Sequence, residues 1–409
     1  MSAPLTVYQE LFQVFQTAAG NRVRVSSIAR FTVFVMGIVA AKSCILAQIA
    51  RELEGLALTK AVADSIERRL RRILNDPHLT PEVFYQPLLR QLIDWQQIVN
   101  SSRRLVLVID ESTKEDEIHL FRVSLTYRGR AVPLAWVVWQ QNTKMAPGAY
   151  WLYVDELLAT VAALLPSGVD VIVVADRAYE VPAFVDRIAA LGWHWIVRAK
   201  TKASTRFLDY RGHQQSLASV LNRHVPEPGR RWKAQGWVFK DAGWRKVSVV
   251  AIWGLSWNEP LAVLTDLRPT WEVLALFDRR FWVEPSFRDD KSRGWQWENC
   301  QVKGLEHHQR LLLLMAAATL VTLCLGLQEA KACLERLAAR LTQGRAEIGK
   351  PRKAKLSLFS LGSARMKKWL YGTIKSVGRL FLTDLNAPSW QQTWYQWQSL
   401  MYIFKTVRP

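Results

Sequence analysis

Two apolar runs in the middle of the chain end in an acidic residue. Residues 105–109 read Leu-Val-Leu-Val-Ile and are followed by Asp110, and residues 169–175 are rich in β-branched side chains and are followed by Asp176. Such runs are typical of strands that are buried on both faces of a sheet. An acid just past the carboxyl end of such a strand lies where open α/β sheets bind ligands. The pattern therefore predicts a carboxylate site at one edge of a sheet.

The order of the apolar segments predicts the fold that carries these strands. Three strands come first, followed by alternating helices and strands, at residues 105–109, 118–126, 131–139, 149–164, 169–175, 181–191 and 194–199. With a last helix around Glu284, this β-β-β-α-β-α-β-α order predicts an α/β fold with an RNase H-like core. Such a core has a mixed sheet with helices on both sides.

The distance between the second acid and the last helix predicts an insertion. Asp176 and Glu284 lie 108 positions apart, more than one short helix and one strand require. The stretch from about 201 to 268 alternates apolar and polar residues between glycines, which predicts an inserted antiparallel β subdomain. We therefore expect a helical region, a catalytic region containing the insertion and a basic helical C-terminal region, with bounds 1–100, 101–327 and 328–409. The basic segment Lys350–Lys355 is expected to form an exposed linker or arm.

A second group of charged residues lies on the predicted last helix. Phe277, Arg280, Glu284 and Lys291 are separated by three, four and seven positions, which places them close to one helix face. A solvated, salt-bridged face would show the same spacing, and a single strand-end acid can be a simple cap. The combination of two strand-end acids with Glu284 favours a site instead. Three carboxylates without a His or Cys cluster favour hard divalent cations such as Mg²⁺ or Mn²⁺.

These residues resemble the signature of the IS4 superfamily of DDE transposases, which includes the Tn5 type. Arg280, Glu284 and Lys291 match its Tyr-2-Arg-3-Glu-6-Lys pattern, with Phe277 at the Tyr position. Phe277 lacks the hydroxyl that the family uses on a DNA-end phosphate. The family's two catalytic aspartates match Asp110 and Asp176, and the segment 175–179 (Ala-Asp-Arg-Ala-Tyr) looks like the motif around its second acid.

The resemblance implies a cut-and-paste transposase of an insertion sequence. Asp110, Asp176 and Glu284 would bind two Mg²⁺ (or Mn²⁺) ions, which support in-line phosphoryl transfer. Phe277, Arg280 and Lys291 would contact the DNA end. The implied steps are nicking at the element ends, hairpin formation and strand transfer. The implied partners are double-stranded DNA, as terminal inverted repeats and target, and a second copy of the chain in a homodimeric synaptic complex. The implied location is the bacterial cytoplasm, on the nucleoid.

The net charge of +20 agrees with a polyanionic partner. Within the helical region, four arginines surround an apolar stripe, which predicts a DNA-binding helix, although a solvated basic helix is the plainer alternative. These are Arg68, Arg69, Arg71 and Arg72. The four cysteines are scattered without metal-site or disulfide spacing, which fits a reducing compartment.

Three other interpretations remain open at this point. One is a metal-dependent nuclease of the same fold that cuts without joining, and another is a domesticated DNA-binding protein without transposition. The third is a peripheral membrane protein attracted by the positive charge, which is disfavoured because no basic amphipathic anchor stands out. Residues 311–327 are uncharged but fall short of the roughly 18–20 residues of a spanning helix, so we expect a buried core helix and no membrane.

Overall fold

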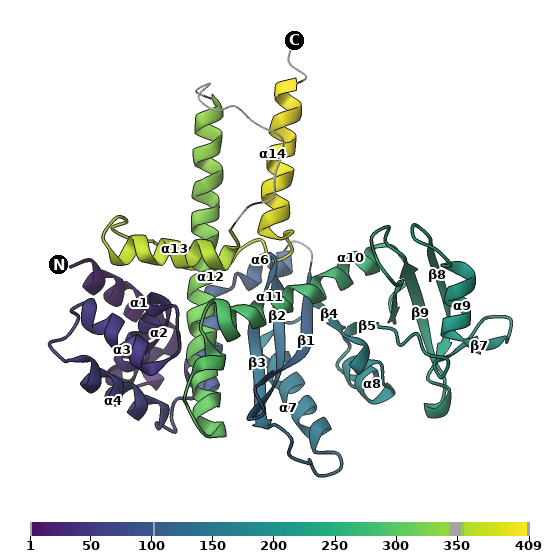
Figure 1. Ribbon diagram of the computed structural model, residues 1–409, viewed down its shortest axis with the longest axis horizontal. Helices are drawn as coiled ribbons and strands as arrows, with labels where there is room; N and C mark the ends of the chain where they lie inside the picture. Colours follow the sequence, from purple (N-terminus) through teal and green to yellow (C-terminus); the bar gives the residue numbers. More distant parts are fainter. Residues whose placement is uncertain (1, 101–102, 343–353, 355, 407–409) are drawn as a thin grey trace.

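A computed structural model describes residues 2–100, 103–342, 354 and 356–406. Within these residues, the fold is mixed α/β, with one ten-stranded sheet in the order β3-β2-β1-β4-β5-β10-β9-β8-β6-β7. The strands are β1 (Arg104–Lys114), β2 (Ile118–Tyr127), β3 (Arg130–Gln140), β4 (Asp170–Ala175), β5 (His194–Arg198), β6 (Arg206–Leu208), β7 (Gln214–Ser216), β8 (Arg231–Val238), β9 (Arg245–Ile252) and β10 (Leu261–Thr265). Figure 1 shows this sheet between a helical group at the N-terminal end and a β-rich lobe at the other end.

The first five strands follow the predicted order, with one correction at Asp110. This residue does not come after β1 but lies inside it, because β1 continues to Lys114 as the antiparallel partner of β2. On its other side, β1 pairs in parallel with β4 only as far as Val108. Asp110 therefore still lies just beyond the carboxyl end of the parallel part of the sheet. Asp176 follows β4 directly, as expected.

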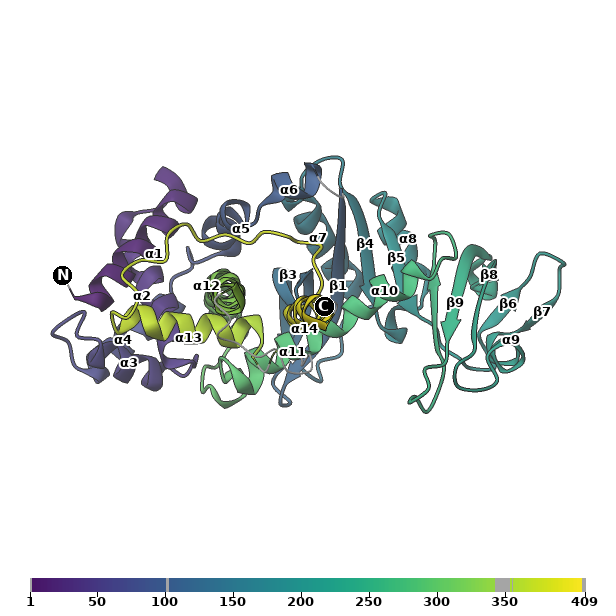
Figure 2. The same cartoon turned by 90° about the horizontal axis from the view of Figure 1, so that it is seen from above.

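The stretch that we predicted as an insertion contains β6 to β10 and the helix α9 (Leu217–His224). It does not form a sheet of its own, because β10 pairs antiparallel with β5 and with β9. The inserted strands thus extend the central sheet sideways, and Figure 2 shows them as its far end. The division of the chain into three regions with the predicted bounds stays a prediction.

Most of residues 2–100 are helical, and these helices pack beside a long central helix, α12 (Leu305–Thr342). They are α1 (Ala3–Ala19), α2 (Val25–Ala41), α3 (Leu46–Gly55), α4 (Ala63–Leu74), α5 (Gln86–Leu92) and α6 (Trp95–Asn100), with the short helices η1 (Gly20–Arg22) and η2 (Pro81–Tyr85). In Figure 2, α12 is seen end-on between this group and β3. Its segment Leu305–Ala339 is long and apolar enough to span a membrane, but 94% of its most apolar window is buried inside the protein. This burial is that of a core helix.

The C-terminal region crosses α12 and then projects from the body. α13 (Leu358–Leu370) packs on α12 where Gly326 and Gly362 meet; a Cβ added to Gly362 would lie 1.8 Å from the carbonyl oxygen of Thr322. Only glycine fits such a crossing. α14 (Trp390–Thr406) and the end of α12 project from the same side of the molecule (Figure 1). Of the predicted basic arm Lys350–Lys355, all but Ala354 lie outside the described residues.

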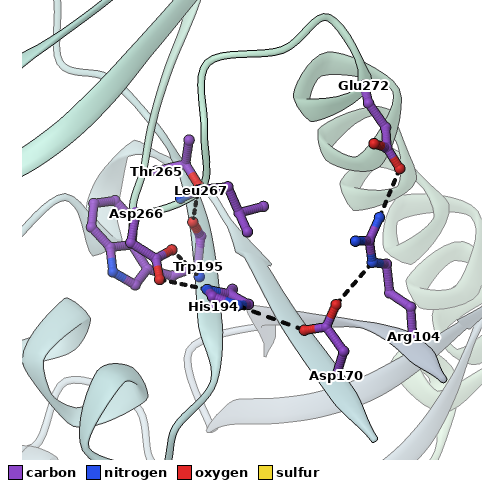
Figure 3. Close-up of polar contacts among 8 residues, drawn as sticks. All are labelled: Arg104, Asp170, His194, Trp195, Thr265, Asp266, Leu267 and Glu272. Atoms are coloured by element: carbon purple, nitrogen blue, oxygen red, sulfur yellow. Dashed lines mark hydrogen bonds and ion pairs between the residues drawn. The ribbon is translucent and has the colours of Figure 1, made fainter.

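A polar network at the amino ends of the parallel strands fixes the start of the helix that leads to Glu284 (Figure 3). Arg104 in β1 bonds to Asp170 in β4 at 3.0 Å and to Glu272 at 2.7 Å. Glu272 begins α10 (Glu272–Asp278). His194 in β5 contacts Asp170 at 3.8 Å and, on its other ring nitrogen, Asp266 at 2.7 Å. The network thus anchors α10 at the edge of the sheet opposite to Asp110 and Asp176.

Candidate active site

A helical tract runs from α10 along one side of the sheet to α11 (Figures 1 and 2), the helix that carries Glu284. After α10 it changes pitch through η5 (Arg279–Trp282), α11 (Val283–Arg288) and the π-helical η6 (Asp289–Arg293). The predicted single helix over 277–291 is therefore continuous but irregular. Arg280 lies in η5 and Glu284 in the first turn of α11, so both sit one turn apart on the same side.

Three bonds hold α11 and η6 on the hairpin formed by β2 and β3. The hydroxyl of Ser286 accepts from the Ala131 N–H at 2.7 Å. The guanidinium of Arg130 donates to Asp289 at 2.6 Å. A third bond joins the buried Arg122 to Asp290, also at 2.6 Å. Glu284 is thereby fixed relative to the sheet, since its helix is attached to the hairpin of β2 and β3.

The guanidinium of Arg280 brings the three predicted acids together. Its Nη1 donates to Glu284 Oε1 at 2.9 Å, and its Nη2 donates to Asp110 Oδ2 at 3.3 Å. The same Nη2 lies 3.7 Å from Asp176 Oδ2. Side chains from β1, from the end of β4 and from α11 thus converge on one cation.

The three acidic side chains differ in how far they are exposed to solvent, and the one in the sheet, Asp110, is the most buried. The side chain of Asp110 is 17% exposed, that of Asp176 33% and that of Glu284 51%. Burial raises the pKa of Asp110, and the charges of Asp176 and Glu111 raise it further. Arg280 and the Glu111 N–H, which donates to Asp110 at 3.0 Å, oppose this rise in pKa but do not cancel it. Burial is thus the largest influence on this carboxyl, and Arg280 offsets it only in part.

The donor set fits a hard divalent cation, although the side chains are arranged around Arg280. Three carboxylates facing one another with a deficit of positive charge are the ligands that Mg²⁺ or Mn²⁺ prefers. In the part of the chain that the structure describes, no three His, Cys, Asp or Glu side chains are grouped closely enough to hold a metal ion. The carboxylates would therefore have to move away from Arg280 to share an ion.

A polar cluster next to the acids was not predicted from the sequence. Glu111 accepts from the hydroxyl of Tyr179 at 2.9 Å and from that of Tyr150 at 2.8 Å, and its other oxygen contacts His119 Nε2 at 2.5 Å. Burial pushes the pKa of Glu111 up, but these hydrogen bonds outweigh it and leave the pKa below its usual value. Glu111 thus ties the strand of Asp110 to the turn after Asp176. The position of Tyr179 inside the segment 175–179 was the available signal.

Two residues of the predicted helix face lie elsewhere. Lys291 contacts Glu298 at 3.7 Å and makes no ion pair with Glu284 among the described residues. Phe277 is fully buried and packs edge-to-face on Phe281, with ring centroids 6.1 Å apart. In this conformation the ring of Phe277 faces the core, and its contact with DNA stays a prediction. The ring faces the core because the side of α10 that carries Phe277 packs against β4 and β5.

The four arginines of α4 are exposed on the side away from its buried stripe of Ile66, Leu70 and Ile73. Arg71 pairs with Glu67 one turn earlier, and Arg68 donates to the backbone oxygen of Asp64. Arg69 and Arg72 complete the set. The geometry is that of a basic, solvated helix face, and a role for it in DNA binding stays a prediction.

A cavity of about 740 Å³ lies between α10 and the loop that follows β9. Trp257 and Phe281 line it, and both rings are partly exposed. Glu259 at its rim contacts Arg198 at 2.7 Å and Arg177 at 3.5 Å. Arg177 follows Asp176 in the chain.

The comparison of sequences decides the family. A model of the family described as "Transposase DDE domain" matches residues 110–321, which is just over half of the chain. The chain belongs to this family of DDE transposases. The family's chemistry is phosphoryl transfer on DNA, and the matched segment begins at Asp110 and includes Asp176, Arg280 and Glu284.

Other comparisons add little to this family assignment. No curated protein matches the chain. Among solved structures, it is similar to the "piggyBac transposase synaptic complex with hairpin DNA", with 9% sequence identity and a TM-score of 0.41. That similarity covers 99% of this chain and 82% of the other. At this identity and score, it supports no conclusion about fold or function.

Proposed function

We propose that this DDE transposase is a cut-and-paste enzyme of the IS4 superfamily, of the Tn5 type, with an RNase H-like core. The observation that carries the proposal is the convergence of Asp110, Asp176 and Glu284 on Arg280. These residues come from three separate elements, yet they match the family's acidic triad and signature in identity and spacing. The order of strands and helices from β1 to β5 supports the RNase H-like core.

Within this proposal, Asp110, Asp176 and Glu284 would hold two Mg²⁺ or Mn²⁺ ions. Such ions, when bound, activate the attacking oxygen and stabilise the leaving oxygen of an in-line displacement. Arg280 can swing from the carboxylates to a phosphate, for which its planar fork is suited. Among the described residues, the ion pair of Lys291 is a 3.7 Å contact with Glu298, so its ammonium group is available to hold a neighbouring phosphate.

The experiment that tests the function uses the full chain and linear DNA that carries the segments flanking its gene. With Mg²⁺ present, denaturing gels should show nicks at the element ends, then hairpins, and then joined products with a second DNA. Nicks without hairpins or joining would indicate a nuclease of the same family. Binding without any cut, with both Mg²⁺ and Mn²⁺, would overturn the proposal and favour a domesticated DNA-binding protein.

A homodimer in the synaptic complex and specific binding of terminal inverted repeats are parts of the same proposal. They are supported by the match to the family and by the positive charge of the chain. Size-exclusion chromatography coupled to light scattering, with and without the end DNA, measures the stoichiometry. Two chains per pair of DNA ends is the expected result, and one chain per end without pairing would contradict it.

A further inference from the structure

A cavity of about 560 Å³ opens among the N-terminal helices, far in the sequence from the three acids. It lies between the start of α2 and the loop that follows α4. Its polar lining consists largely of arginine, serine and histidine side chains, which are Arg22, Arg24, Arg30, Ser26, Ser27 and His78.

The charges around this cavity are unbalanced. Asp76 is its single acidic lining residue, 3.8 Å from Arg30. Arg30 also donates to the backbone oxygen of Ser26 and to the hydroxyl of Ser27, at 3.2 and 3.0 Å, which holds its guanidinium at the cavity. Arg22 and Arg24 are exposed, and neither pairs with an acid within the described part of the chain. Three guanidiniums against one carboxylate leave an excess of two positive charges.

We propose that this cavity binds the sugar-phosphate backbone of DNA, with a phosphate held between Arg22, Arg24 and Arg30. Planar guanidiniums bind phosphate oxygens in pairs, and such contacts fix the position of DNA without reading its sequence. The cavity is larger than one phosphate requires. Arg30 also lines a second cavity, of about 370 Å³, together with Arg69 of α4. A duplex backbone can therefore run from this cavity toward the basic face of α4. The inference rests on the proposed function in that DNA is the substrate.

The test compares two double variants that each remove two positive charges. Arg22→Ala/Arg24→Ala changes the cavity, whereas Arg51→Ala/Arg90→Ala changes exposed arginines of α3 and α5 outside it. Binding of a labelled 40-base-pair duplex (a length of about four helical turns) is measured by fluorescence anisotropy over a range of salt concentrations. The cavity variant should lower the log–log salt slope by about 0.9, the contribution of one lost phosphate contact. The control variant should leave the slope nearly unchanged.

Equal slopes for the two variants would overturn the inference. Inorganic phosphate serves as a second probe: if the cavity variant loses phosphate binding but keeps the wild-type slope for DNA, the cavity is a site for free phosphate, and the inference is also overturned. If the wild-type protein cuts end DNA but the cavity variant has the same salt slope as the wild type, only this inference fails. If the wild-type protein binds no duplex at all, the proposed function fails with it.

A separate observation concerns Arg280, which contacts all three acids through two nitrogens. Its side chain is only 13% exposed, and its Nε has no hydrogen-bond partner among the described residues. The guanidinium thus occupies the space between the carboxylates, with one positive charge against three negative ones. A divalent cation shared by these carboxylates and the guanidinium compete for the same oxygens.

We infer that Arg280 is the resident counter-ion of the site and couples cation binding to DNA binding. As long as Arg280 holds the carboxylates, a cation must displace it. A DNA phosphate offers the guanidinium another partner, which frees the carboxylates, so DNA and cation each favour the binding of the other. This inference rests on the proposed function of the acids as cation ligands.

Mn²⁺ binding without DNA, followed by calorimetry and by electron paramagnetic resonance, tests this coupling without an activity assay. Arg280→Gln should bind Mn²⁺ at least about fivefold more tightly than the wild type, in the range typical of coupled sites. The matched control is Arg177→Gln, which is adjacent to Asp176 but contacts Glu259. Pre-cut end DNA should tighten Mn²⁺ binding to the wild type but not to Arg280→Gln.

Unchanged or weaker Mn²⁺ binding by Arg280→Gln overturns the coupling. If Asp110→Asn does not weaken Mn²⁺ binding, the cation is bound elsewhere, and both the coupling and the proposed role of the acids are refuted.

Discussion

The guanidinium of Arg280 lies 3.3 Å from the carboxylate of Asp110, although 170 positions separate the two residues in the chain. The register of the sheet explains why Asp110 is free for this contact. Its cross-strand neighbour on β2 is Arg122, whose side chain is already bound to Asp290. Cross-strand neighbours point to the same face of a sheet, so Asp110 faces the helical tract that carries both Arg280 and Asp290.

The three acids should be required for cleavage but not for DNA binding. Asp110→Asn, Asp176→Asn and Glu284→Gln each remove a proposed cation ligand while leaving the basic surfaces intact. We expect each to lower the nicking rate by more than the roughly 10–100-fold typical of changes to residues behind metal ligands. Gel assays of nicking and anisotropy measurements of DNA binding separate the two effects.

Asp170→Asn is the matched control for these variants, because Asp170 begins β4, the strand that Asp176 follows, and lies in the network of Figure 3. It should keep nearly full nicking activity. A variant of one of the three acids that nicks as fast as this control would not be a catalytic residue.

The hydrogen bond between Glu111 and Tyr179 should affect the rate more than DNA affinity. Tyr179→Phe removes only a hydroxyl from a buried ring, so the bond that links the strand of Asp110 to the turn after Asp176 is lost. We expect a roughly tenfold lower single-turnover nicking rate at saturating DNA, as for other residues that position metal ligands, with little change in Kd for DNA. Tyr153→Phe, on the same helix as Tyr150, is the control, because that ring stacks on Trp139 instead. Equal effects on rate for both variants would show that the Glu111 cluster has no positioning role.

The buried carboxyl of Glu180 predicts a pH-dependent contribution to stability. Burial raises its pKa from 4.5 to about 7, although the N–H and the charge of Lys200 oppose this. Since the folded state binds the proton more tightly than the unfolded state, the stabilisation is complete below pH 4.5 and is lost as the pH rises through about 7. Glu180→Gln removes the ionisable group and should stabilise the protein at pH 8 by roughly 3 kcal/mol, at about 1.4 kcal/mol per pH unit.

Thermal unfolding between pH 4.5 and 8 measures this effect. The Tm of Glu180→Gln should equal that of the wild type near pH 4.5 and exceed it progressively toward pH 8. The control is Glu156→Gln, which changes an exposed residue. A constant difference in Tm between Glu180→Gln and the wild type over this range would mean that Glu180 does not titrate there.

The elements that could be predicted are those whose pattern is local. The helix expected at 149–164 coincides with α7 (Ala149–Leu164), and the hairpin of β2 and β3 turns at Arg128 and Gly129, both with positive φ. Periodicity and turn residues specify such elements without tertiary information. Both aspartates were predicted near the carboxyl edge of the parallel strands, where the structure has them, because apolar runs mark these strands clearly.

The features that could not be predicted depend on pairing between distant segments. The continuation of β1 past Asp110 requires β2 as a partner, and the attachment of the inserted strands to the central sheet requires the pairing of β10 with β5. The contact of Arg280 with all three acids requires three elements to be in place. The spacing on a helix indicated that Arg280 lies beside Glu284, but not that it reaches Asp110.

The burial of Phe277 predicts that a hydroxyl added at this position destabilises the protein. A DNA-facing ring would tolerate Phe277→Tyr, but the buried ring would carry the new hydroxyl into the core. A buried hydroxyl without a partner costs about 1–3 kcal/mol, so a lower urea midpoint is expected. Phe281→Tyr is the control, because the ring of Phe281 is 39% exposed and its hydroxyl can reach water. Equal stability of Phe277→Tyr and the wild type, with tighter binding of end DNA, would instead favour a DNA contact.

The buried pair of Arg122 and Asp290 should hold the helix of Glu284 in place. Losing either partner alone should strongly destabilise the protein. Both side chains are at most 8% exposed, their atoms approach to 2.6 Å, and Arg122 also stacks over the ring of Phe287 at 4.3 Å. Burial raises the pKa of Asp290, against the charge and the hydrogen bond of Arg122. Removal of one partner leaves the other buried without compensation, so Arg122→Met and Asp290→Leu should each destabilise the protein by about 3–5 kcal/mol.

The double variant Arg122→Met/Asp290→Leu distinguishes the pair from two independent residues. Because it leaves no buried charge, its destabilisation in urea unfolding should be far smaller than the sum of the two single effects. The exposed pair of Arg187 and Asp155, at 2.7 Å, provides the matched comparison and should give a coupling of at most about 1 kcal/mol. If the two single effects simply add in the double variant, Arg122 and Asp290 do not act as a unit. The attachment of α11 would then depend on Arg130, Asp289 and Ser286 instead.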